Sequence, residues 1–100
     1  MTIQGDSFST HLTADGTSDG QATNAHRQRL LGVVLEAGSG ADANVAIYDG
    51  HTSGGTKILG LSVAAKGSTS YTVPAMGRVC ETNIFADLTG SGATVTLYWN

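Results

Sequence analysis

Cysteine, charge and long apolar runs are scarce in this chain, and each shortage excludes a class of protein. The single cysteine, Cys80, excludes an internal disulfide framework and a zinc site built from the cysteines of one chain. Only 13% of the residues are charged, and the five basic residues are scattered, which argues against a nucleic-acid-binding surface. No apolar run approaches the roughly 18 residues of a membrane-spanning helix. We therefore expect no nucleic-acid partner and no membrane partner.

The first residues also lack the features of a secretion signal. Met1–Asp6 has neither a basic start nor an apolar stretch. A lone free cysteine is typical of proteins that stay in a reducing compartment. We expect synthesis in the cytoplasm of the cell that makes the protein. With 100 residues, the chain can form one domain at most.

Residues 1–26 differ in composition from the rest of the chain. They contain three aspartates and no Lys or Arg, so they carry the whole net charge of −3. Their larger apolar residues, Ile3, Phe8 and Leu12 among them, follow no sustained period. We predict an extended N-terminal arm over 1–26, mobile in the free protein and ordered in an assembly. The alternative is that Ser7–Thr13 adds a strand to the protein's own sheet, with Phe8 and Leu12 on one face.

Residues 27–100 alternate apolar and polar side chains with a period of two, which is typical of strands with one buried face. Turns rich in Gly, Ser and Asp separate six such segments. The pattern predicts an all-β domain, an antiparallel β-sandwich that is jelly-roll-like or Ig-like. The expected core consists of Leu31, Val33, Leu35, Val45, Ile47, Leu59, Leu61, Val63, Ile84, Leu88, Val95, Leu97 and Trp99.

A second apolar set faces away from the predicted core. It consists of Leu30, Val34, Tyr48, Phe85 and Tyr98. One interpretation is that both sheets are partly covered, or that the predicted register is displaced by one residue. The other is that these side chains form a contact between subunits, where Tyr and Phe are favoured. Because a small domain gains much from association, we predict a homo-oligomer, most simply a trimer.

The sequence contains no arrangement of residues that is typical of an enzyme or a metal site. His11, His26 and His51 lack the spacing of a metal-ligand pair. Cys80 has no histidine nearby in the sequence that would activate its thiol. Asp15–Gly20 resembles part of a calcium loop but lacks the required glutamate, so we interpret it as turns. We expect no catalytic residue, no cofactor, no metal and no small-molecule substrate.

Arg27 and Arg29 are the one pair of basic residues close together, and they lie where the predicted arm meets the sandwich. They are either solvated at the start of a strand or an anchor for an acidic group of a partner, for which the guanidinium fork is well suited. In the second interpretation they dock the arm on a partner together with its apolar residues Ile3, Phe8 and Leu12.

Six short motifs occur between residues 29 and 100. They are Arg29–Val34, Val45–Gly50, Ser53–Leu59, Pro74–Gly77, Ile84–Gly90 and Val95–Trp99. In these motifs the chain resembles small structural proteins encoded beside the capsid genes of tailed bacteriophages. The resemblance implies a decoration or cement protein on the virion head, with the major capsid protein and further copies of itself as partners. The alternative is a binding module of a phage fibre or tail that recognises a host-surface glycan through exposed aromatic residues with polar neighbours.

Overall fold

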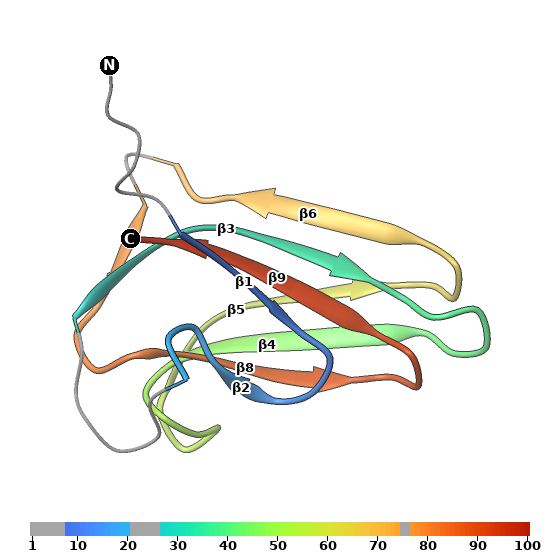
Figure 1. The fold of residues 1–100 in the computed structure, drawn as a ribbon, viewed down its shortest axis with the longest axis horizontal. Coiled ribbons are helices and arrows are strands. Elements are labelled where there is room, and N and C mark those ends of the chain that lie inside the picture. The colour runs from blue at the N-terminus through green and yellow to red at the C-terminus, as the bar shows by residue number, and fades with distance from the viewer. Residues whose placement is uncertain (1–7, 21–26, 75–76) are drawn as a thin grey trace.

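The computed structural model describes residues 8–20, 27–74 and 77–100, which form strands and no helix (Figure 1). The strands are β1 (Phe8–Leu12), β2 (Gly16–Thr17), β3 (Gln28–Glu36), β4 (Ala43–Asp49), β5 (Thr56–Val63), β6 (Ser68–Thr72), β7 (Arg78–Cys80), β8 (Ile84–Thr89) and β9 (Thr94–Trp99). Within these ranges, no helix is long and apolar enough to span a bilayer.

The strands form two antiparallel sheets. In sheet A the order is β1-β9-β3-β6, and β7 also pairs with β3. In sheet B the order is β2-β8-β4-β5. Figure 1 shows sheet A lying across sheet B. The predicted all-β antiparallel sandwich is therefore confirmed.

The core lies between the sheets and is built from the inward positions of the central strands. Alternation of side chains along β4, β8 and β9 places their apolar residues inside, as predicted. The buried apolar residues are Leu30, Val33, Leu35, Ala43, Val45, Ile47, Cys80, Ile84, Ala86, Ala93, Val95 and Leu97. Leu88 and Trp99, also predicted for the core, are only partly buried against it.

The start of β3 departs from the predicted alternation. Leu30 is fully buried, whereas Leu31 is only half buried, the reverse of the prediction. The register between β3 and β9 shifts between Leu30 and Gly32, and regular alternation resumes at Val33. A β-bulge of this kind adds one residue to a strand and changes the face of every side chain before it.

The predicted burial of β5 is also corrected. Leu59, Leu61 and Val63 lie opposite residues of β4 that are at most 2% exposed, yet they are themselves only partly buried. The reason is position, because β5 is the last strand of sheet B and has a neighbour on one side only.

Residues 8–20 lie within the two sheets, so the predicted boundary of an arm at residue 26 does not apply to them. Phe8–Leu12 pairs with β9 and Gly16–Thr17 pairs with β8. These residues follow the alternative prediction, in which the segment adds a strand to the protein's own sheet. The segment lacks a periodic pattern of apolar residues, and its pairing with the distant strand β9 gives it its strand structure. Residues 1–7 and 21–26, including Ile3 and His26, lie outside the described residues.

Truncation of a side chain should reduce stability more at the centre of the sandwich than on its edge strand β5. Leu97→Ala should lower the free energy of unfolding by about 2–5 kcal/mol, because Leu97 is fully buried and its truncation leaves a cavity. Leu61→Ala should lower it less, because that side chain already contacts solvent. Denaturant-induced unfolding of both variants measures the difference, and equal losses would contradict this account of β5.

Candidate interaction surfaces

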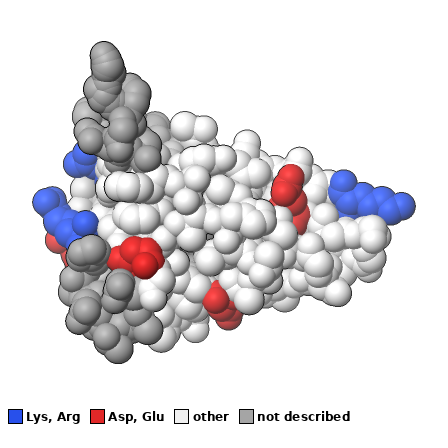
Figure 2. Space-filling model, in the orientation of Figure 1, with Lys and Arg blue, Asp and Glu red and all other residues white. Residues whose placement is uncertain are grey.

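The outer face of sheet A is nearly uncharged. Val34 and Tyr98 point outward from β3 and β9, since they alternate with the buried positions of those strands. Their neighbours on this face are mainly hydroxyl-bearing residues of β1, β6 and β9. Figure 2 has this face toward the viewer and shows charged side chains mainly around its margin. Tyr98 is 43% exposed and lies close to Gly32, which has no side chain to displace the ring.

The outer face of sheet B carries a second aromatic pair. Tyr48 and Phe85 are direct cross-strand partners on β4 and β8, with ring centroids 6.4 Å apart. Both side chains are half buried. The four predicted subunit-contact residues, Val34, Tyr48, Phe85 and Tyr98, therefore all lie on outer faces, but on opposite sides of the sandwich. They form two separate patches.

Two of the predicted docking residues lie on β1. Phe8 is 52% exposed, and its ring centroid lies 4.8 Å from that of Trp99. The Trp99 indole Nε1 donates a hydrogen bond of 2.9 Å to Thr10 Oγ1, and Thr10 Oγ1 donates to the carbonyl of Ser18. Leu12 is partly buried against the core. Phe8 is thus available at the surface, whereas Leu12 stabilises the fold.

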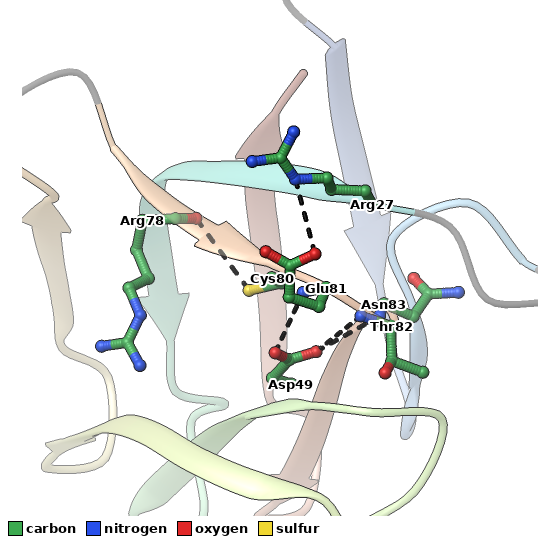
Figure 3. A network of polar contacts seen from close by, with 7 residues as sticks. All are labelled: Arg27, Asp49, Arg78, Cys80, Glu81, Thr82 and Asn83. Carbon is green, nitrogen blue, oxygen red and sulfur yellow. Dashed lines mark hydrogen bonds and ion pairs between the residues drawn. The ribbon is translucent and has the colours of Figure 1, made fainter.

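The three arginines lie at one end of the sandwich. Arg27 and Arg29 line an open pocket of about 240 Å³ with Gln28, Val79 and Asn100. Arg78 lies on β7, the strand that pairs with this part of β3. Arg27 Nε is 3.5 Å from Glu81 Oε1, and both side chains are about 70% exposed, so this ion pair adds little stability (Figure 3). The pocket has the charge and donors to hold a carboxylate.

A buried polar network fastens β2 to β3 and β8. Ser18 Oγ donates to Gln28 Oε1 and also contacts Asn83 Oδ1 at 3.4 Å. The Asp19 carboxylate accepts from Gln28 Nε2 at 2.8 Å and from Asn83 Nδ2 at 3.1 Å. Asn83, which is fully buried, also accepts from the backbone N–H of Ile84 at 2.8 Å. These polar side chains satisfy one another inside the protein, where an unpaired group would be destabilising.

Asp49 gives the Val45–Gly50 motif a structural role. Its carboxylate accepts hydrogen bonds from the backbone N–H groups of Glu81, Thr82 and Asn83, at 3.0, 2.9 and 3.5 Å (Figure 3). The motif therefore holds the turn between β7 and β8 against the end of β4. A carboxylate that accepts several backbone hydrogen bonds is a strong local constraint.

Cys80 is a buried thiol at the end of β7. It is fully buried, and its Sγ lies 4.0 Å from the carbonyl of Arg78. Burial, together with the nearby charge of Asp49, raises the pKa of the thiol to about 11, and the charge of Arg78 partly opposes this shift. The thiol is therefore protonated at neutral pH, which disfavours a role as a nucleophile.

The described histidines lie apart from each other. His11 Nδ1 is 3.0 Å from Thr96 Oγ1 on the outer face of sheet A, and His51 lies between β4 and β5. In the described parts of the chain, no three His, Cys, Asp or Glu residues are grouped as metal ligands would be.

Sequence reasoning missed the polar residues of the interior. Ser18, Gln28 and Asn83 are ordinary turn or strand residues in the sequence, and only their long-range contacts distinguish them. Gln28 carried no signal of its burial, because the predicted alternation turned Leu31 rather than Leu30 toward the core and therefore placed Gln28 on the outer face.

Comparison with protein-family models, with curated proteins and with solved structures found no match to this chain. We therefore base its function on the motifs of the sequence and on the surfaces described above.

The contacts of Asp49 can be tested by two substitutions. Asp49→Ala removes the acceptor of three backbone N–H groups and should lower the free energy of unfolding by about 1–3 kcal/mol. Asp49→Asn keeps one oxygen and should lower it less. Glu36→Ala, which removes an exposed carboxylate bonded to Thr94, is the control and should have little effect. Thermal unfolding measures the stability of the three variants. An Asp49→Ala variant as stable as the Glu36→Ala control would show that the Asp49 carboxylate does not stabilise the turn.

The raised pKa of Cys80 predicts a pH dependence of stability. Because the folded-state pKa of about 11 lies above that of an unfolded thiol, its contribution is complete below about pH 9 and is lost as the pH rises toward 11. Unfolding of the native protein and of Cys80→Ala should be followed across this range. Their difference in free energy should shrink with rising pH, and a constant difference would contradict burial of the neutral thiol.

Proposed function

We propose that this protein is a non-enzymatic structural protein of a bacteriophage virion that binds the surface of the capsid and stabilises the head as a decoration or cement subunit. The six motifs between residues 29 and 100 support the proposal through their resemblance to small proteins encoded beside capsid genes. Its main partner is then the major capsid protein. It is made in the host cytoplasm and resides on the surface of the virion head.

The observation that carries the proposal is the outer face of sheet A. Protein-binding surfaces are poor in charge at their centre and favour Tyr, and this face has few charged side chains and exposes Tyr98 beside Val34. Hydroxyl groups of the flanking strands can donate to and accept from the backbone of a partner. A flat, rigid sheet also loses little conformational entropy on binding.

The arginine pocket supplies a second, polar contact in this proposal. Arg29 lines it with its backbone paired to Asn100, N to O at 2.9 Å and O to N at 3.0 Å, so the backbone that carries this side chain is held in place. A carboxylate of the capsid protein entering this pocket would orient the subunit. Each copy needs only moderate affinity, because contacts repeated over a symmetric shell reinforce one another.

Binding to particles tests the proposal. Capsids assembled from the major capsid protein of the same genome are mixed with the purified protein and sedimented. The native protein should sediment with the particles, and Tyr98→Ser should weaken binding at least about tenfold, as expected for a central aromatic contact. Tyr48→Ser, the same change on the opposite face, is the matched control and should bind as the native protein does.

Two results would overturn the capsid proposal. The first is a native protein that stays in the supernatant. The second is equal binding by the Tyr98→Ser and Tyr48→Ser variants, because sheet A would then not be the docking face. Thermal unfolding of both variants confirms that lost binding does not reflect lost folding.

A second candidate function is recognition of a host-surface glycan by a fibre or tail module. It is favoured by the exposed ring of Tyr98, because Ser9 and Thr96 lie beside it on the same face, and such a ring can stack on a sugar. Adsorption of the labelled protein to host cells distinguishes the two functions. Binding to cells that Tyr98→Ser abolishes, with no binding to capsids, would favour the glycan.

A further inference from the structure

The edge strands of the two sheets differ in how they are protected from pairing with another chain. An edge strand presents unpaired N–H and C=O groups, and proteins block such an edge with a lysine, a bulge or a very short strand. In sheet B, β5 carries Lys57 and a register shift against β4, and β2 has only two residues. In sheet A, the edge strand β6 has five residues, Ser68–Thr72, with no charge and no register shift. Strand β6 therefore carries none of these protections.

The backbone of β6 alternates between groups that bond to β3 and groups that face outward. The N–H of Val73 donates to the carbonyl of Leu31 at 2.9 Å, so these two residues form a hydrogen-bonded pair. Every second pair of an antiparallel ladder is hydrogen-bonded, so Tyr71 and Thr69 also bond to β3. The alternate residues direct their N–H and C=O groups to the outer edge, where the described chain places no strand. These residues are Ser68, Ser70 and Thr72.

Strand β6 also extends past the margin of sheet B. In Figure 1 it lies beyond β5, the edge strand of that sheet. Tyr71 pairs with Val33 and so faces the same side of sheet A as the core, yet Tyr71 is 43% exposed whereas Val33 is buried. The ring of Tyr71 is exposed because no strand of sheet B covers it. A further strand beside β6 would contact this ring and bond to the free backbone groups.

We propose that β6 pairs with β6 of a second copy in antiparallel orientation, with Ser70 opposite Ser70 of the second copy. Ser68 then faces Thr72 of the second copy, and the facing pairs together exchange about six backbone hydrogen bonds. On the core side, Tyr71 of each copy lies beside Thr69 of the other. Aromatic and β-branched side chains stabilise a sheet when they face each other across neighbouring strands.

The sequence of β6 and its flanks fits an identical strand and limits the pairing to the length of β6. No charge within β6 repels a second copy, and in this register Lys66 lies opposite Pro74 of that copy, far from its Lys66. Proline has no N–H to donate, and Lys66 has a φ of 68°, so the ladder ends at both positions. Each copy uses its single β6 edge, so the pairing gives a closed dimer rather than the trimer expected from the sequence.

The pairing joins the two copies of sheet A into one continuous sheet. The two-fold axis is perpendicular to this sheet, so both outer faces point the same way and Tyr98 of each copy lies on a shared surface. Formation of the dimer does not depend on binding to capsids. A dimer that binds a capsid through this surface would make the same contact twice.

Cysteine substitutions test the register of the pairing. The Cα atoms of a hydrogen-bonded antiparallel pair lie about 5.5 Å apart, a distance that a disulfide spans. Ser70→Cys should therefore form a covalent dimer with oxidised glutathione, as seen by non-reducing electrophoresis. Ser68→Cys and Thr72→Cys should each stay uncrosslinked alone, because each lies far from its own position in the second copy, but they should cross-link when mixed. The native Cys80 is fully buried in each variant's parent fold and does not take part.

A proline at the axis tests the backbone contact itself. Five residues bury less than a standard interface, so the native protein should form dimers in sedimentation experiments at about 100 μM. Ser70→Pro removes an N–H that β3 does not use and should raise the dissociation constant at least about tenfold. Ser70→Ala, the matched control, keeps that N–H and should associate as the native protein does. Thermal unfolding confirms that both variants are folded.

Several results would overturn the proposal. They are a native protein that is monomeric at this concentration, an oligomer that Ser70→Pro leaves intact, and a Ser70→Cys variant that does not cross-link. A monomeric native protein whose binding to capsids is lost in Ser70→Pro would show instead that β6 accepts a strand of the capsid protein. Capsid binding that Tyr98→Ser weakens, with no dimer in solution, would contradict only the pairing and not the proposed function.

Discussion

The structure depends on how the chain crosses from sheet A to sheet B between β1 and β2. Residues 8–20 contribute a strand to each sheet, because β1 pairs with β9 and β2 pairs with β8. The Ser18–Gln28–Asn83 network holds the chain in place directly after β2, where the crossing reaches sheet B. Such a network stabilises a unique arrangement only when its members satisfy one another, which they do here through Asp19 as well. The crossing joins the edges of the two sheets along one side of the sandwich, as the turn between β5 and β6 does along the other.

Period-two alternation was sufficient to predict the sandwich and the interior of β4, β8 and β9. It failed where burial depends on a neighbour rather than on the strand itself. The order of Leu30 and Leu31 depends on a bulge against β9, and the exposure of Leu61 depends on β5 being an edge strand. Neither the bulge nor the edge position of β5 can be deduced from the local sequence. For the same reason, β1 could be proposed only as an alternative to an arm.

The sequence predicted which surface residues face away from the core, but not which of them lie together on one sheet. Alternation correctly indicated that Val34, Tyr48, Phe85 and Tyr98 face away from the core, but only the topology separates them onto two sheets. The separation matters for the function we propose. A capsid contact through the face of sheet A, as we propose, would leave the opposite face with Tyr48 and Phe85 uncovered.

Hydrogen exchange at the backbone amide of Ser18 tests the central claim most directly, because Ser18 directly follows β2, where the crossing reaches sheet B, and its N–H donates to the carbonyl of Ile84 at 2.9 Å. If the crossing is part of the core, this amide exchanges only when the whole protein unfolds, with the protection of the amides that join β3 and β9. Exchange of Ser18 orders of magnitude faster than that of β3 and β9 would show that the segment opens on its own, and would contradict the account.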